Sequence, residues 1–106
     1  MNAKAKGTAG ELAIIKKLEA EGWECYKSAA SAGTFDVIAL KAGDGTGPGQ
    51  IKLVQVKRFG DRRGYGRSTL IESLKGWTGY AWVSAWLAER QDGQREWSWT
   101  EAKRSE

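Results

Sequence analysis

Apolar side chains near the N-terminus recur with the spacing of one helix face. They are Leu12, Ile14, Ile15 and Leu18. Gly22 follows the last of them and marks an end, because glycine is common just past the C-terminus of a helix. The pattern predicts a helix over residues 8–21, and Thr8 with Glu11 has the spacing of a capping box at its start.

After Gly22 the period changes to the alternation that is typical of strands. Large and β-branched side chains dominate residues 23–28, 35–41 and 51–58. The last two runs are joined by the glycine-rich segment 43–49, which predicts a turn and therefore an antiparallel hairpin. The sequence thus predicts three strands after the first helix, two of which pair directly.

A second helix and two further strands are predicted in the remaining part of the chain. Residues 69–77 carry apolar side chains on one side, and Thr69 with Glu72 again has the spacing of a capping box. Residues 80–87 and 96–100 alternate as strands do, and a turn signal separates them. The predicted order is α-β-β-β-α-β-β, in a single domain over all 106 residues, without an internal repeat or a linker.

A carboxylate interrupts the apolar stripe of the first predicted helix. Glu11 lies about 40° from Ile15 and about 20° from Leu18 around a helix of about 3.6 residues per turn. The capping box explains this position if Glu11 is taken alone, because its carboxylate would accept from the amide of Thr8. The alternative is that Glu11 faces a functional site.

Polar residues also collect at one end of the predicted hairpin. Alternation places Asp36 on one face of the first strand, and Gln55 and Lys57 on one face of the second. Since the strands are antiparallel, the start of the first lies beside the end of the second, so we expect Asp36 near Gln55 and Lys57. An exposed ion pair between Asp36 and Lys57, worth under ~1 kcal/mol, would account for this pattern without any function. If the helix packs over that face of the sheet, Glu11 joins the group and a site results.

Composition narrows the chemistry of such a site. The chain has no histidine and a single cysteine, which excludes Ser-His-Asp and Cys-His nucleophilic sites, the usual zinc sites and an internal disulfide. Carboxylates and lysines must therefore carry any catalysis, and carboxylate oxygens favour Mg²⁺ or Mn²⁺. The 17 Lys and Arg exceed the 13 Asp and Glu to give a net charge of +4, which favours a polyanionic partner.

Nothing in the sequence indicates a membrane or secreted protein. No apolar run approaches the ~20 residues needed to cross a bilayer, and the first residues lack the hydrophobic segment of a signal peptide. We therefore expect a cytoplasmic protein that acts without a membrane partner.

Basic residues follow the second strand of the hairpin in a glycine-rich segment. They are Arg58, Arg62, Arg63 and Arg67. Arginines between glycines suit contacts with phosphate, whereas the structural alternative is an ordinary solvated loop. Lys4 and Lys6 near the N-terminus add two further candidates for DNA binding.

Tryptophan is frequent in the last third of the chain. Alternation places Trp82 and Trp86 on one face of a strand, and Trp97 and Trp99 on one face of the next. Such residues belong to the core or to an interface. An exposed aromatic face of this regular spacing would favour a dimer surface over a platform for stacking bases.

Three motifs resemble those of the archaeal-type Holliday-junction resolvases, a branch of the PD-(D/E)XK nuclease superfamily. They are Lys6–Glu11 at the start of a helix, Lys27–Ser31 leading into Phe35–Ala39, and Gln55–Lys57. The resemblance spans roughly residues 4–90 and includes the order of the elements. It implies an α/β (α+β) fold with a restriction-endonuclease-like core, in which helices flank a central mixed sheet. It also implies a homodimer that cleaves branched DNA, the four-way junction.

The resemblance assigns a role to each motif residue. The implied ligands of Mg²⁺ or Mn²⁺ are Glu11, Asp36, Gln55 and the carbonyl of Val56. Lys57 would position or activate the attacking water, or stabilise charge at the phosphate. Ser31 in the loop and Lys27 before it would contact the phosphate, although a serine in a loop of small residues is also an ordinary turn residue.

The sequence departs from the family pattern at positions that bear on the choice of function. Gln55 replaces the acid of the (D/E)XK motif, and Leu12 and Lys27 stand where the family often has arginine. Two other functions stay open. One is another nuclease of the same superfamily that acts on flap or linear DNA, and the other is a non-catalytic DNA-binding module. Gln55 is the feature that is compatible with a non-catalytic module, whereas the intact Glu11, Asp36 and Lys57 favour an enzyme.

Overall fold

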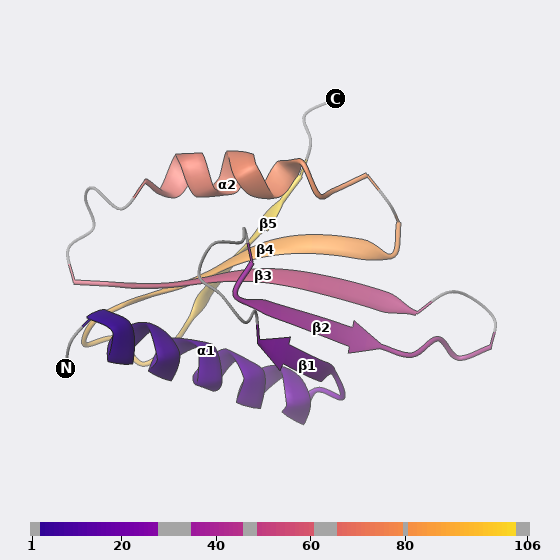
Figure 1. Ribbon diagram of the computed structural model, residues 1–106, viewed down its shortest axis with the longest axis horizontal. Helices are drawn as coiled ribbons and strands as arrows, with labels where there is room; N and C mark the ends of the chain where they lie inside the picture. Colours follow the sequence, from indigo (N-terminus) through magenta and orange to yellow (C-terminus); the bar gives the residue numbers. More distant parts are fainter. Residues whose placement is uncertain (1–2, 28–34, 46–48, 61–65, 80, 104–106) are drawn as a thin grey trace.

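Two helices flank a five-stranded sheet in the computed structural model of this chain (Figure 1). The structure describes residues 3–27, 35–45, 49–60, 66–79 and 81–103, with side chains from Ala9 onward. The elements are α1 (Ala3–Ala20), β1 (Glu24–Lys27), β2 (Val37–Lys41), β3 (Gln50–Phe59), α2 (Arg67–Lys75), β4 (Val83–Gln91) and β5 (Ser98–Ala102). The predicted order α-β-β-β-α-β-β is confirmed. Neither described helix has the length and apolar character needed to cross a membrane.

The sheet is mixed, and its strands lie in the order of the chain. β3 and β4 are parallel, whereas the other neighbouring pairs are antiparallel. A parallel pair needs a crossover connection, and α2 lies in that connection. β2 and β3 pair with Val37 opposite Val54, which is the hairpin that alternation predicts. The predicted fold class, a mixed sheet flanked by helices, is confirmed.

Each helix covers a different face and a different part of the sheet. α1 packs against β1, β2 and β3, while α2 makes its main contacts with β4 and β5, so the two lie on opposite sides (Figure 1). The core under α1 consists of Ile14, Leu18, Trp23, Val37, Ala39, Val54, Val56 and Ala88. The core under α2 consists of Leu53, Leu74, Ala85, Leu87 and Ala102. The main contacts of α2 are therefore not with β2 and β3, although one face of these two strands lies on the same side of the sheet as α2.

The first helix begins earlier than predicted. α1 starts at Ala3, so Thr8 lies inside it, where backbone amides are bonded within the helix. A capping box needs Thr8 at the helix boundary. The capping explanation of Glu11 is therefore wrong, and another partner has to account for its position on the apolar stripe.

The second helix also begins two residues before the predicted start. α2 starts at Arg67, and its N-cap residue is Gly66, which has a left-handed φ of 71° and no side chain to cap the first turn. The predicted capping box of Thr69 and Glu72 is wrong for the same reason. Glu72 instead accepts a hydrogen bond of 2.8 Å from Lys75 one turn later.

β4 extends beyond its predicted end at residue 87. It pairs with β3 in parallel register over its whole length, up to Phe59 opposite Gln91. β4 continues as long as the backbone of β3 offers hydrogen-bonding partners. The alternation of side chains within one segment does not reveal how long such a partner strand is. The predicted turn after it is confirmed, because Gln94 donates its amide to the carbonyl of Gln91 at 3.0 Å and Gly93 has a φ of 91°.

The aromatic strand faces belong to the core. Trp86, Trp97 and Trp99 are partly buried and pack against the core under α1. Trp82 precedes β4 and lines a groove with Leu40, on the other side of the sheet. The expectation that Trp82 and Trp86 share a face is therefore wrong, because regular alternation starts only after Trp82.

Ile14→Ala is expected to lower the free energy of unfolding by about 2–5 kcal/mol, because Ile14 is fully buried. Leu12, in contrast, is 52% exposed and lies about 160° from Ile14 around α1, so its predicted place on the apolar stripe is wrong. Leu12→Ala is the matched control and should change stability by less than about 0.5 kcal/mol. Chemical denaturation measures both variants, and equal losses would contradict this orientation of α1.

Candidate active site

The start of β2 and the end of β3 bring Asp36 and Gln55 together. Asp36 directly precedes β2 and donates its amide to the carbonyl of Val54 at 2.9 Å, which extends the register of the hairpin by one residue. Its carboxylate oxygen Oδ2 accepts from Nε2 of Gln55 at 2.9 Å and from the backbone amide of Val56 at 2.8 Å. The predicted proximity of Asp36 and Gln55 is confirmed, and the backbone of Val56 takes part in the same group.

Asp36 is partly buried, and this burial raises the pKa of its carboxyl group. The amide of Val56 lowers the pKa, the charge of Glu11 raises it, and the charge of Lys57 lowers it. The sum is a pKa above the ordinary value for aspartate. Glu11 and Lys57 therefore lie near enough to Asp36 for their charges to act on its carboxyl group.

Glu11 approaches Asp36 from the opposite side of the sheet to Gln55. Alternation along β3 turns Val54 and Val56 toward the core under α1, and Leu53 toward the core under α2, so Gln55 and Lys57 face the side of α2. The first helix therefore does not pack over the face of Gln55 and Lys57, which was the condition set above for Glu11 to join the group. The charge of Glu11 can nevertheless act on Asp36, because Asp36 lies at the end of its strand, beside the edge of the face that α1 covers.

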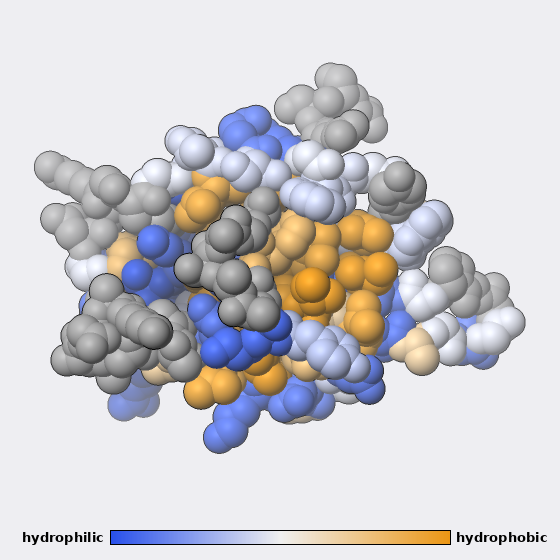
Figure 2. Space-filling view, in the orientation of Figure 1, coloured by the Kyte–Doolittle hydropathy of each residue, from blue (hydrophilic) through white to orange (hydrophobic). Residues whose placement is uncertain are grey.

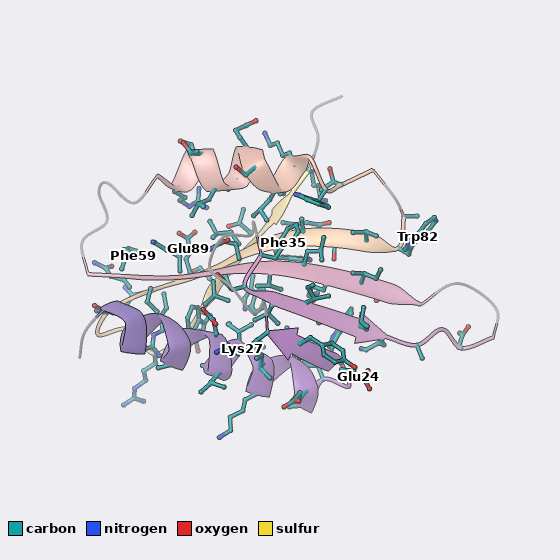
Figure 3. All side chains as sticks on the ribbon, in the orientation of Figure 1. Glu24, Lys27, Phe35, Phe59, Trp82 and Glu89 are labelled. Atoms are coloured by element: carbon teal, nitrogen blue, oxygen red, sulfur yellow. The ribbon has the colours of Figure 1, made fainter. Side chains whose placement is uncertain are left out.

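Glu11 has a basic partner on β1. Nζ of Lys27 lies 3.5 Å from Oε1 of Glu11, and the Glu11 side chain is 22% exposed. The predicted place of Glu11 on the inward side of the helix is thus confirmed, and Lys27 is paired with its carboxylate. Figure 3 shows Lys27 at the end of β1 beside α1.

The available donors suit a hard divalent cation only with the help of neutral oxygens. Within the described ranges, no group of three or more carboxylates, cysteines or histidines is placed to hold a metal ion. Two carboxylates are present, those of Glu11 and Asp36, with the amide oxygen of Gln55 and the carbonyl of Val56 as neutral candidates. Such oxygens are the usual ligands of Mg²⁺ and Mn²⁺.

One acidic residue of this region was missed by sequence reasoning. Glu89 of β4 is opposite Lys57 of β3 in the parallel register, is only 9% exposed, and accepts a hydrogen bond of 2.8 Å from Nε of Arg67. Burial raises the pKa of Glu89. The signal was the continued alternation after Leu87, which puts Glu89 on the same face, but the predicted strand ended at Leu87.

The comparisons with known proteins agree with this architecture. The family model described as archaeal Holliday junction resolvase (Hjc) matches residues 2–106. The chain belongs to this resolvase family. A search of the curated proteins finds no match.

A solved structure shows the resolvase fold directly. The structure of Archaeoglobus fulgidus Hjc, a Holliday junction resolvase from an archaeal hyperthermophile, matches with a TM-score of 0.58 and 17% identity. The alignment covers 95% of this chain and 79% of that chain. At this identity the likeness supports the fold, while the family match identifies the chain as a junction-resolving nuclease whose substrate is branched DNA.

The predicted DNA-binding arginines of the resolvase are engaged within the protein where they are described. Arg58 lies 3.4 Å from Asp92 and its side chain is 17% exposed. Arg67 is the first residue of α2. It donates hydrogen bonds to the carboxylate of Glu89 and, at 3.1 Å, to the hydroxyl of Thr100. Their contacts with DNA stay a prediction. The remaining predicted residues, Ser31, Arg62, Arg63 and the side chains of Lys4 and Lys6, lie outside the described residues.

Proposed function

We propose that this resolvase hydrolyses phosphodiesters of the four-way junction in the cytoplasm with Mg²⁺ or Mn²⁺ held by Glu11, Asp36, Gln55 and the carbonyl of Val56. The observation that supports this site is the hydrogen-bonded group at Asp36, on which Glu11 and Lys57 act electrostatically. Ser31 and the basic residues predicted above are proposed to contact the DNA backbone. These assignments name the residues of this chain that would carry out the family's nuclease activity.

The charges at Asp36 fit a divalent cation. Burial and the neighbouring Glu11 both raise the pKa of Asp36, so the site concentrates negative charge at a cost in free energy. A cation between Glu11 and Asp36 would offset that cost. When bound, such an ion supplies a nucleophilic water at neutral pH and neutralises charge that develops on the phosphate.

The protein groups then orient and complement the reacting phosphate. The Val56 amide and the Gln55 amide hold the oxygen Oδ2 of Asp36, and the proposed role of the other oxygen is to bind the ion. Lys57, on the same strand as Gln55, adds a positive charge that stabilises the phosphate as its negative charge grows. Lys27 offers a second cation once phosphate competes with Glu11 for it.

Cleavage of a labelled four-way junction tests the proposed function. Linear duplex and flap DNA of matched sequence serve as competing substrates, with Mg²⁺, Mn²⁺ or EDTA. We expect paired nicks on the junction with either metal and none in EDTA. Preferred cleavage of the flap would indicate another structure-specific nuclease, and binding without cleavage in either metal would indicate a DNA-binding module.

Gln55→Glu is expected to lower the dissociation constant for Mn²⁺ about tenfold, because it adds a carboxylate to the ligand group. Without metal it should cost about 1–2 kcal/mol of stability, since the hydrogen bond from Gln55 to Asp36 becomes a contact between like charges. Electron paramagnetic resonance of free Mn²⁺ and thermal unfolding in EDTA measure the two effects. An unchanged Mn²⁺ affinity would argue against Gln55 as a ligand.

We further propose that two copies associate through the open sheet face, defined by Ile38, Leu40, Ile51 and Trp82. These residues lie on the α2 side of β2 and β3, and Leu40, Ile51 and Trp82 line a groove of about 410 Å³. Leu40 is 37% exposed and Trp82 is 44% exposed. Apolar residues gather there over β2 and β3 (Figure 2), and a patch of this kind on a small protein favours an interface.

A two-fold dimer suits the substrate, because a four-way junction must be cut symmetrically in two strands. Leu40→Lys is therefore expected to convert the dimer into a monomer and to replace paired nicks by single, uncoupled nicks. Light scattering after size-exclusion chromatography gives the mass, and Leu12→Lys on the exposed side of α1 is the control. A Leu40→Lys variant that stays dimeric would place the interface elsewhere.

A further inference from the structure

The carboxylate of Glu89 is buried at a place where the core under α2 would accept an apolar side chain. Glu89 is the one charged residue classed as buried in the part of the chain that the structure describes, with 9% exposure. It follows Ala85 and Leu87 on the same face of β4, both fully buried. A buried charge is unfavourable unless its partners offset the cost of its desolvation. A reason for retaining this acid is therefore needed.

The ion pair with Arg67 does not offset this cost by itself. The Arg67 side chain is 47% exposed, while the Glu89 side chain is 11% exposed. An ion pair with one solvated partner contributes little to stability, and less than the desolvation of the carboxylate costs. The pair does, however, hold the carboxylate in place through the hydrogen bond of 2.8 Å that Nε of Arg67 donates to it.

The sheet register places Glu89 beside the motif lysine. Lys57 and Glu89 are direct partners in the parallel pair of β3 and β4, and side chains of such partners point to the same face. Figure 3 shows Glu89 between α2 and the sheet. The strand that carries Lys57 has Gln55 where the motif has an acid, so its own residues supply no carboxylate near Lys57 on this face.

We propose that Glu89 is a positioning residue for Lys57. Arg67 fixes the Glu89 carboxylate, and Glu89 in turn orients the Lys57 ammonium toward the scissile phosphate. This role rests on the proposed function, in which Lys57 stabilises that phosphate. β3 carries Gln55 where the motif has an acid, and the neighbouring strand β4 carries the acid Glu89. In this proposal Glu89 restrains Lys57 and does not bind the metal.

Glu89→Gln is the decisive variant, because glutamine keeps the shape of the side chain and an acceptor for Arg67 but removes the charge. At saturating protein we expect the single-turnover rate to fall about tenfold. The dissociation constant for the junction, measured in EDTA, should stay within about twofold of the wild type. Glu89→Asp, which retains the charge, should recover part of the rate. An unchanged rate in Glu89→Gln would overturn the proposal.

A double-mutant cycle with Lys57→Ala separates positioning from a structural role. If Glu89 acts through Lys57, Glu89→Gln has no further effect on the slow rate of Lys57→Ala, whereas losses that multiply would overturn the proposal. Thr100→Val is the control, since it removes the second partner of Arg67 and leaves Glu89 intact. Its rate should equal that of the wild type. If Thr100→Val loses as much rate as Glu89→Gln, the network acts by holding α2, and the proposal is overturned.

The same experiment distinguishes this proposal from the proposed function. A wild-type chain that binds the junction and does not cleave it overturns both. A wild type that cleaves, together with a Glu89→Gln variant of equal rate, overturns only the role of Glu89.

Discussion

Asp36→Asn is expected to lower the single-turnover rate of junction cleavage by at least about 1000-fold, equivalent to about 4 kcal/mol of transition-state stabilisation. The carboxylate of Asp36 is hydrogen-bonded to Gln55 and Val56 and is acted on electrostatically by Glu11 and Lys57, so its charge is central to the proposed metal site. Junction binding in EDTA should persist, because phosphate contacts come from basic residues.

The same substitution should not unfold the protein. Asparagine keeps a carbonyl oxygen for the amide of Val56, and burial disfavours the charged form of Asp36, so a neutral side chain is tolerated there. We expect the thermal midpoint in EDTA to equal or exceed that of the wild type. Glu19→Gln on the exposed side of α1 is the matched loss of one charge and should cleave normally. Wild-type cleavage by Asp36→Asn would rule out Asp36 as a metal ligand.

Lys57→Ala is expected to reduce the single-turnover rate by about 10²–10³-fold, the usual loss when one preorganised charge partner of the transition state is removed. Lys57 is on the same face of β3 as Gln55 and lowers the pKa of Asp36, so its charge is felt at the centre of the site. The loss should appear at saturating protein, because the lysine acts mainly on the developing charge. Lys57→Arg should retain part of the rate, since the charge remains but its position changes.

Lys41→Ala provides the control for a general loss of basic charge. Lys41 ends β2, at the opposite end of the strand from Asp36, and lies 4.6 Å from the ring centre of Trp23. Its removal should change junction affinity slightly and leave the saturated rate unchanged. Equal losses in Lys41→Ala and Lys57→Ala would show that both act through overall charge, and Lys57 would then have no special place at the phosphate.

The alternation of the sequence was sufficient to predict the centre of the candidate site. Asp36 and Gln55 belong to two strands joined by a glycine-rich turn, and such a hairpin has one simple register. The spacing of Glu11 on the apolar stripe was also readable from the helical period. These features depend on residues that are near in sequence or paired by a local turn, so the backbone geometry of each element is enough to derive them.

The tertiary structure determined the side on which α1 packs and the length of β4, which the separate elements do not indicate. α1 covers the face opposite to Gln55 and Lys57, and β4 extends to Glu89 and Gln91 because β3 offers it a parallel partner. The length of a strand and the side on which a helix packs depend on contacts between distant segments, which the period of a single segment does not contain. By itself the sequence determined the elements, their order and the proximity of Asp36 to Gln55 in the hairpin. Only the packing of β3, α2 and β4 placed a buried carboxylate next to Lys57.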